Sequence, residues 1–330
     1  MLQRPDTIIK EYRIPDAPDA WVTILHDDLL HPVLGGNKLR KLDALLPTLQ
    51  PSGITDVVTC GGLQSAHTAA IAAACAERGL RSHLLVRGER PAVPTGYHLL
   101  ARMYGEVTYV PRSEYADRDA MLQRHAASIE AGLPAEAKVC IIEEGAASPL
   151  ACLGLIRLVA HLARHWAASN RAVTIVTDCG TGTTAIGLAI GIAFLDLPWK
   201  VQGVMLADSA EYYLQQQKKL AKAFSSDFLT DSSAALRAKL ERLPLHWVER
   251  LHPRKFGSIL PGEIAICRQI ARELGLLLDP IYSLAAWEVA LQSAAEHSTG
   301  EDGSQHRVCI LHCGGLHGLY GLAQRYPADF

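Results

Sequence analysis

The chain has 330 residues, a formal net charge of -2 and 49% hydrophobic residues. This length and apolar content predict two cores, and the scattered Lys and Arg residues exclude the basic stripe of a nucleic-acid-binding surface. No signal segment opens the chain and no uncharged apolar run reaches membrane-spanning length, so we expect a cytoplasmic protein without nucleic-acid or membrane partners. The 8 cysteines lack Cys-x-x-Cys pairs, which favours buried free thiols over a metal site.

Residues 35–42 read Gly-Gly-Asn-Lys-Leu-Arg-Lys-Leu and form the first informative motif. The two glycines allow the backbone to approach a bound molecule closely. The pKa of a lysine amine falls when the amine is desolvated or lies near cations, here Arg40 and Lys41, and the amine then becomes a nucleophile. The motif therefore predicts that Lys38 attacks a carbonyl cofactor, with an ordinary turn before a helix as the alternative.

Short β-branched runs alternate with alanine- and leucine-rich stretches along the rest of the chain. The predicted strands are Thr55–Val58, Ser82–Val86, Val107–Val110, Val139–Ile142, Ala172–Thr177, Val201–Leu206 and Arg307–His312. Such alternation predicts parallel sheets covered by helices on both faces, with ligands at the carboxyl ends of the strands. Three glycine turns follow strands at that end, and their free N–H groups can bind an anion: Cys60-Gly61-Gly62, Cys179–Gly182 and Cys313-Gly314-Gly315.

The first of these turns leads into Gln64-Ser65-Ala66-His67 and an alanine-rich helical stretch. Ser65 is a suitable N-cap for that helix. The functional alternative is that Ser65, the neighbouring N–H groups and His67 bind a substrate carboxylate at the helix N-terminus.

The second turn, Gly180-Thr181-Gly182-Thr183-Thr184, follows an apolar strand and precedes a helix, so its N–H groups and hydroxyls can surround a phosphate. The same residues satisfy a dinucleotide fingerprint, Gly180-x-Gly182-x-x-Ala185, with Asp208 in the place of a ribose-binding acid. A merely structural tight turn is a third interpretation.

Later segments are less specific. Residues 225–253 are polar and are expected to form a helix and a connecting loop, and residues 296–306 a surface loop. Tyr282 precedes a helical pattern and is either a general acid or base or a packed tyrosine. His312 and His317 are expected to be structural, because no carboxylate or cysteine stands at metal-ligand spacing.

Taken in order, these motifs resemble the pyridoxal-phosphate (PLP) enzymes of fold type II, specifically the family of 1-aminocyclopropane-1-carboxylate (ACC) deaminase and D-cysteine desulfhydrase. The matching segments are Asp27-Asp28-Leu29 with residues 35–42, the loop 61–65, Ser148-Pro149-Leu150, the cup 180–184, the tyrosine segment 279–282 and the turn 312–315. The resemblance implies an α/β, tryptophan-synthase-β-like PLP fold type II with two parallel-sheet domains and the cofactor cleft between them. It further implies a larger PLP-binding domain of residues 1–42 and 154–330, a smaller inserted α/β domain of residues 43–153, and a homodimer.

The resemblance also implies roles for individual residues. Lys38, Ser65 and Tyr282 would be catalytic, with Lys38 forming the Schiff base. The cofactor would be bound by Asn37, Lys38, Lys41, Gly180, Thr181, Gly182, Thr183, Thr184 and Ser283. A small amino-acid substrate would be bound by Gln64, Ser65 and His67.

Several positions depart from the family pattern. Ala66 replaces an asparagine, Ala69 an arginine, and Ser283 an acid or threonine, while Phe256 aligns loosely with a tyrosine of the deaminases. If Ser283 faces the pyridine nitrogen, its neutral hydroxyl leaves that nitrogen largely unprotonated, which favours β-elimination.

His67 and Phe256 resemble the desulfhydrases, so a D-cysteine desulfhydrase-like lyase that yields a keto acid and ammonia is the predicted function. The alternatives are an ACC deaminase, a PLP-binding member with a diverged substrate or no turnover, and, third, a dinucleotide-dependent oxidoreductase.

Overall fold

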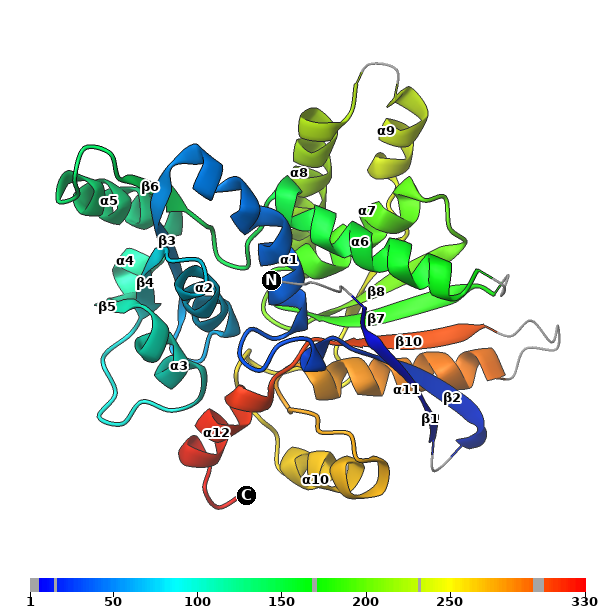
Figure 1. Cartoon of the computed structure of the whole chain (residues 1–330). Coiled ribbons are helices and arrows are strands. Elements are labelled where there is room, and N and C mark those ends of the chain that lie inside the picture. Colours follow the sequence, from blue (N-terminus) through cyan, green and yellow to red (C-terminus); the bar gives the residue numbers. More distant parts are fainter. Residues whose placement is uncertain (1–5, 15–16, 168–170, 231–232, 299–305) are drawn as a thin grey trace.

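The computed structural model describes residues 6–14, 17–167, 171–230, 233–298 and 306–330, and within them the chain forms two parallel-stranded sheets with helices on both faces (Figure 1). One sheet has the strand order β1-β2-β10-β7-β8-β9 and the other the order β5-β4-β3-β6. Only β1 runs antiparallel to its neighbour. The α/β fold with two parallel sheets predicted from the βα alternation is confirmed.

The elements have the following bounds in chain order: β1 Ile8–Ile14, β2 Ala17–His26, η1 Asp27–Leu29, α1 Gly36–Leu45, η2 Leu46–Thr48, η3 Gln50–Ser52, β3 Ile54–Gly62, α2 Ala66–Ala76, β4 Arg81–Arg87, α3 Gly96–Tyr104, β5 Glu106–Val110, α4 Arg112–Tyr115, α5 Arg118–Ala131, β6 Lys138–Ile141, α6 Pro149–His165, β7 Val173–Cys179, α7 Thr183–Phe194, β8 Trp199–Met205, α8 Ala210–Phe228, α9 Ala234–Glu241, β9 Leu245–Glu249, α10 Glu263–Leu274, α11 Ser283–Ser298, β10 Arg307–His312 and α12 Leu316–Arg325. All seven strands predicted from the sequence are present, most with longer bounds.

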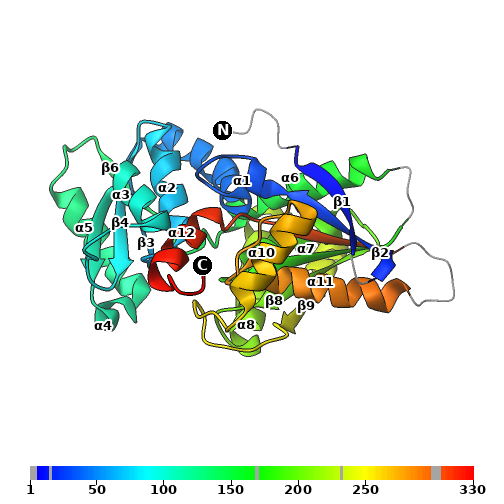
Figure 2. The same cartoon turned by 90° about the horizontal axis from the view of Figure 1, so that it is seen from below.

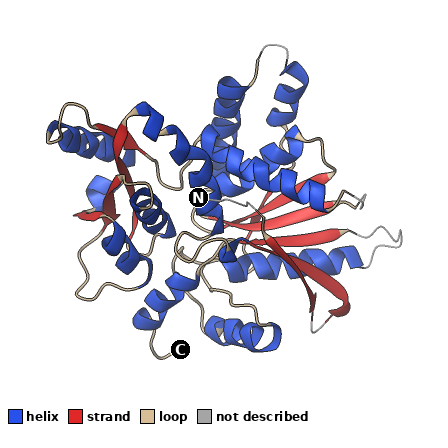
Figure 3. Cartoon of the chain, in the orientation of Figure 1, coloured by secondary structure: helices blue, strands red, loops and turns tan. Residues whose placement is uncertain are grey.

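Helices cover both faces of the central part of the larger sheet (Figure 3). Helices α6, α7 and α8 pack on one face, and α10 and α11 pack on the other. Every residue of β7 is buried, as its continuous β-branched sequence predicts for a central parallel strand. Helix α7 is apolar almost throughout for the same reason, since it lies between the sheet and α6.

The smaller sheet is likewise covered on both faces, by α1, α2 and α3 on one side and by α4 and α5 on the other. Its strands come from residues 54–141, between β2 and β7 in the sequence, which matches the topology of an inserted unit. The exact domain boundaries after residues 42 and 153 stay predictions.

The C-terminal helix α12 returns to the smaller sheet's side and packs against α3 (Figure 2). Glycines permit this contact, because a Cβ on Gly96 would lie 2.6 Å from the carbonyl oxygen of His317, and one on Gly321 would lie 2.7 Å from the Gln64 side chain. Helix α12, which follows β10 of the larger sheet, therefore contacts the smaller unit at the end of the sheets where the glycine turns lie.

Two sequence interpretations need correction. Residues 225–253 hold the end of α8, helix α9 and an edge strand, β9, in place of the expected single helix and loop. The expected loop 296–306 begins inside α11, which extends to Ser298, and residues 299–305 lie outside the described residues. Among the described residues, no helix has the length and apolarity needed to span a membrane.

Candidate active site

A cavity of about 340 Å³ lies at the carboxyl ends of the strands of both sheets. Of the predicted site residues, the following line it: Asn37, Lys38, Lys41, Ser65, His67, Gly180, Thr181, Gly182, Thr184 and Tyr282. Gln64, Thr183 and Ser283 do not line it. The structure thus brings together motifs that lie up to about 250 residues apart in the sequence.

Helix α1 carries Lys38 in its first turn. Gly35, the N-cap, has φ 67°, a conformation that favours glycine. A Cβ on Gly36 would lie 2.1 Å from the Cβ of Asp27, so the second glycine allows the helix to begin against η1. Asp27 in turn accepts a hydrogen bond of 2.6 Å from Arg40 Nη2, and this fully buried pair anchors α1. Arg40 therefore pairs with Asp27, and Lys41 is the motif's cation at the cavity.

The amine of Lys38 projects into the cavity and donates a hydrogen bond of 3.2 Å to Asn37 Oδ1. Asn37 Nδ2 donates in turn to Thr184 Oγ1 at 3.2 Å, which connects the lysine helix to the glycine cup. Burial lowers the pKa of Lys38, opposed by Cys313 and Asp178. Desolvation is thus the main reason why this amine can be neutral and nucleophilic.

Lys41 lies one helical turn after Lys38 and donates to the carbonyl oxygen of Gly145 at 3.0 Å. Burial and the neighbouring Lys38 lower the pKa of Lys41 to about 7. Lys38 and Lys41 thus bring two amines of lowered pKa to the cavity.

The glycine cup lies at the junction of β7 and α7. Gly182 is the N-cap of α7 and has φ 82°, and Thr183 and Thr184 fill the first turn, where backbone N–H groups lack helical partners. Thr181 Oγ1 lies 3.2 Å from Thr183 Oγ1. The cup is held from outside by Tyr213, whose hydroxyl donates to the carbonyl oxygens of Cys179 and Gly180 at 2.7 and 2.8 Å. Sequence reasoning missed Tyr213, because α8 brings it there from 30 residues away.

Ser65 has both of its predicted properties. It is the N-cap of α2, accepting a hydrogen bond from the N–H of Thr68 at 3.3 Å, and it lines the cavity. Gln64 points elsewhere: its amide donates to Thr95 O at 3.0 Å and accepts from the N–H of Tyr97 at 3.2 Å. Gln64 thus connects the loop to α3.

His67 is 3% exposed and lines the cavity, two residues after Ser65 in the sequence. Its Nε2 is 2.9 Å from the hydroxyl of Thr59, which donates its own proton to Ile142 O at 2.6 Å. One hydrogen bond therefore joins Thr59 to the neutral ring of His67. Burial, with Lys38 and Lys41 adding to it, lowers the pKa of His67 to about 3.

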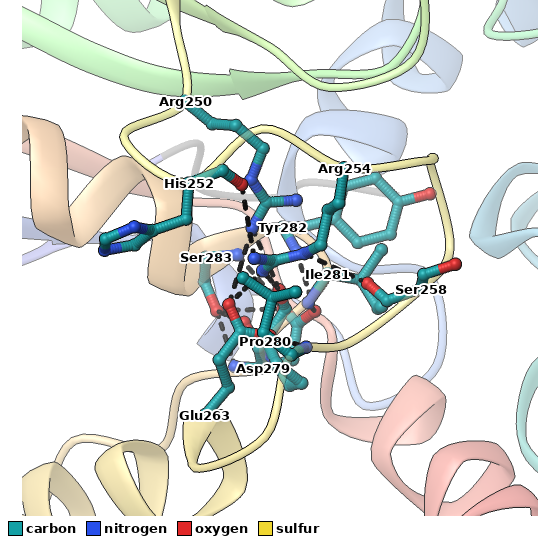
Figure 4. Close-up of polar contacts among 11 residues, drawn as sticks. Arg250, His252, Arg254, Ser258, Glu263, Asp279, Pro280, Ile281, Tyr282 and Ser283 are labelled. Carbon is teal, nitrogen blue, oxygen red and sulfur yellow. Dashed lines mark hydrogen bonds and ion pairs between the residues drawn. The ribbon is translucent and has the colours of Figure 1, made fainter.

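Tyr282 lines the cavity from the turn that precedes α11, with its ring edge-on to Phe256 at a centroid distance of 5.6 Å. Burial and the nearby Asp279 raise its pKa, so its hydroxyl keeps its proton. The Asp279 carboxylate accepts hydrogen bonds from the N–H groups of Ile281 and Tyr282, both at 2.9 Å, and from the Ser283 hydroxyl at 2.8 Å (Figure 4). Ser283 is thus bonded within its own turn.

A buried ionic cluster supports this turn from the outside. The guanidinium groups of Arg250 and Arg254 donate to the carbonyl oxygen of Pro280 at 3.4 and 3.2 Å (Figure 4). Glu263, the first residue of α10, pairs with Arg254 and also accepts a hydrogen bond from the N–H of Leu260 at 2.8 Å. The cluster joins the loop that carries Phe256 to the turn that carries Tyr282.

Other lining residues had no signal in the sequence analysis. Tyr97 reaches the cavity from α3, and burial, with Asp279 adding to it, raises its pKa. Arg87 and Arg118 lie on the Tyr115 ring, at 5.1 and 5.7 Å from its centroid, and also reach the cavity. Asp178 near the end of β7 is a further addition. Position at a strand end could have suggested only Arg87 and Asp178, and many strand ends bind nothing.

These residues fit PLP. The desolvated amine of Lys38 can react with the aldehyde of PLP. The cup offers hydroxyls and unpaired N–H groups of the kind that bind a phosphate group. The volume lies within the usual range of small-molecule sites, about 300 to 1,000 Å³. Among the described residues, no group of three or more His, Cys, Asp or Glu could hold a metal ion.

Comparison with known proteins agrees with this fit. Residues 13–314 match the family model described as pyridoxal-phosphate dependent enzyme. A rice (Oryza sativa subsp. japonica) protein named putative D-cysteine desulfhydrase 2, mitochondrial, is 45% identical over 93% of this chain and 80% of its own length. A Pyrococcus abyssi protein named putative 1-aminocyclopropane-1-carboxylate deaminase is 31% identical over 91% of the chain and 86% of its own length. The crystal structure of an ACC deaminase homologue shares the fold with a TM-score of 0.78, at 23% identity over 98% of this chain and 94% of that one.

Proposed function

Because the chain belongs to the family of pyridoxal-phosphate dependent enzymes, we propose that it is a lyase acting on a small β-substituted amino acid, with D-cysteine as its first candidate substrate. The reaction is a β-elimination that consumes one water and yields pyruvate, hydrogen sulfide and ammonia. The observation that carries the proposal is the amine of Lys38, which faces the cavity and is bonded through Asn37 to the cup residue Thr184. The name of the rice relative supports the choice of D-cysteine as the candidate substrate.

Bound PLP supplies the electron sink for bond breaking at the α-carbon of an amino acid. In the proposed mechanism, Lys38 Nζ holds the aldehyde end and, when free, moves the α-carbon proton, while residues 180–184 hold the phosphate. The Ser65 hydroxyl and the N-terminus of α2 bind the substrate carboxylate, with neutral His67 in the first turn of that helix. The Tyr282 hydroxyl retains its proton and holds it at the departing sulfur.

Phe256 favours β-elimination over the opening of a cyclopropane ring. Its ring lies against Tyr282, so this part of the cavity has one phenol hydroxyl and an apolar neighbour. ACC deamination is the second candidate, because the P. abyssi relative carries that name. The match of residues 13–314 to the PLP family favours a phosphate of PLP, and not a dinucleotide, at residues 180–185.

The first test is the visible absorption spectrum of the purified protein before and after borohydride, with peptide mapping. We expect a yellow chromophore that reduction fixes onto Lys38. Lys38→Ala should lose the chromophore and lower turnover by about 10²-fold or more, as expected for loss of a general base. Lys218→Ala on the exposed face of α8 is the matched control and should keep both. A colourless protein that stays colourless with added PLP would contradict the proposal.

The substrate is tested by a screen of D-cysteine, L-cysteine, β-chloro-D-alanine and ACC, with keto acid, ammonia and sulfide measured. D-Cysteine should give all three products. Turnover of ACC without turnover of any β-substituted alanine would assign the second candidate. A chromophore without any product would indicate a PLP-binding protein with a diverged substrate or no turnover.

The cytoplasm and a homodimer remain our proposals for location and assembly. They rest on the sequence features and the family resemblance, whereas the name of the rice relative includes a mitochondrial location. Cell fractionation and light scattering after gel filtration are the measurements that decide them.

A further inference from the structure

A carboxylate that the proposed mechanism does not use lies in the wall of the cavity. Asp178 is in β7, two residues before the cup, lines the cavity and is 7% exposed. Among the described residues, no hydrogen bond or ion pair joins its carboxylate to another side chain. The other acidic residues that line the cavity differ, because Glu144 lies 3.7 Å from Arg118 and Asp208 is exposed and accepts from the N–H of Ser209.

An unpaired carboxylate in such a place is costly, because burial disfavours its ionised form. Burial, with Asp279 adding to it, raises the pKa of Asp178 to about 6, against the opposing effect of Lys38 and Lys41. Groups of this kind in a cavity are common at functional sites, where a ligand supplies the missing partner. The ligand group that fits Asp178 is a cation or a strong N–H donor.

The chemistry of PLP offers one such group. Its ring nitrogen lies opposite the carbon that bears the aldehyde, so the partner of that nitrogen must come from the cavity wall and not from α1, which carries Lys38. Ser283, the partner expected from the sequence, does not line the cavity, and its hydroxyl is bonded to Asp279 (Figure 4). Asp279 does not line the cavity either, and its carboxylate already accepts hydrogen bonds from the turn 281–283.

We propose that Asp178 is the partner of the PLP ring nitrogen, accepting a hydrogen bond from that nitrogen in its protonated form. A carboxylate there keeps the nitrogen charged and so strengthens the electron sink, whereas a serine hydroxyl would leave it neutral. Asp178 thereby supplies from β7 the negative charge that the hydroxyl of Ser283, at the start of α11, does not carry. This inference rests on the proposed binding of PLP by Lys38.

The test is the nitrogen NMR spectrum of the holoenzyme reconstituted with PLP labelled with ¹⁵N in the ring, recorded at pH 8. We expect the signal of a protonated ring nitrogen in the wild-type enzyme and of an unprotonated one in Asp178→Asn. The dissociation constant of PLP should rise about tenfold in that variant, the change expected for losing one charge-assisted hydrogen bond. Asp208→Asn, an exposed acid of the same cavity, should keep the wild-type signal.

An unprotonated nitrogen in the wild-type enzyme, or a signal that Asp178→Asn does not change, would overturn the inference. The wild-type spectrum alone decides it if the variant does not fold. Borohydride labelling separates this result from the proposed function. A labelled Lys38 with an unprotonated ring nitrogen refutes only the role of Asp178, whereas a protein that takes up no PLP on Lys38 refutes both.

Discussion

At the scale of single residues, the site is defined by ionisable groups that burial holds away from their usual charge state. The pKa of Lys38 and of Lys41 is lowered, that of Tyr282 is raised, and His67 stays neutral in the cavity wall. Burying such groups costs stability, and that cost must appear as a dependence of stability on pH.

His67 gives a prediction with a defined sign. The unfolded chain binds a proton on this residue near its ordinary pKa of 6.5, and the folded chain only near 3. Between these values the unfolded state holds more protons, so the contribution of His67 to the unfolding free energy falls as pH falls. Relative to His67→Gln, the unfolding free energy of the wild-type protein should fall by about 2 kcal/mol as the pH is lowered from 6.5 to 5.

Urea unfolding of the apoprotein at several pH values measures this difference. Comparing the two proteins at each pH cancels the contribution of Asp178, whose raised pKa acts in the opposite direction over the same range. A constant difference between wild type and His67→Gln would contradict the prediction.

At the scale of elements, the N-terminal ends of helices supply many of the residues that line the cavity. Helices α1, α2 and α7 all begin at the cavity, so their unpaired N–H groups and positive ends lie around it. Helix α6 begins in the same way, with Ser148 as N-cap, but Ser148 does not line the cavity. The two serine caps therefore form a natural pair for separating stability from binding.

Ser65→Ala and Ser148→Ala should each lower the unfolding free energy by about 1 kcal/mol, because each removes one N-cap hydrogen bond. Only Ser65→Ala should also raise KM, by about tenfold, because only Ser65 is proposed to contact the substrate carboxylate. Chemical unfolding and steady-state kinetics with D-cysteine measure the two effects. An equal rise in KM in both variants would indicate a general loss of structure.

At the scale of the whole molecule, the cavity belongs to neither sheet alone. Ser65, His67 and Arg87 come from the smaller unit, whereas residues 178–184 and Tyr282 come from the larger one. A ligand that contacts both walls binds the folded arrangement and not the unfolded chain, so it stabilises the entire protein.

PLP should therefore raise the unfolding free energy by about 2.7 kcal/mol at a concentration a hundred times its dissociation constant. Thermal unfolding at increasing PLP concentration measures this effect. Pyridoxal, which has the aldehyde but no phosphate, is the matched ligand and should stabilise the protein less at equal concentration. Equal stabilisation by the two compounds would contradict a phosphate site at Gly180–Thr184.

Much of this protein could be predicted from local sequence. The β-branched runs, the glycine turns and the Gly-Gly-Asn-Lys motif were sufficient to predict the two parallel sheets and the PLP family. They were sufficient because each of these features depends on residues only a few positions apart. Strand β9 was missed because it is a short edge strand whose residues alternate weakly between buried and exposed. The β1-β2 hairpin was missed as well, because the strands were predicted from βα alternation and no helix separates β1 from β2.

The sequence by itself determined which residue types stand at strand ends and helix starts, and hence that an amine and a phosphate cup should exist. Only the tertiary structure decided which of them meet. It directed Gln64 and Ser283 into bonds with Thr95, Tyr97 and Asp279. It also left the carboxylate of Asp178 facing the cavity with no side-chain partner in the part of the chain that the structure describes. The physical reason is that side-chain direction and burial depend on packing between segments far apart in the chain, which local pattern does not encode.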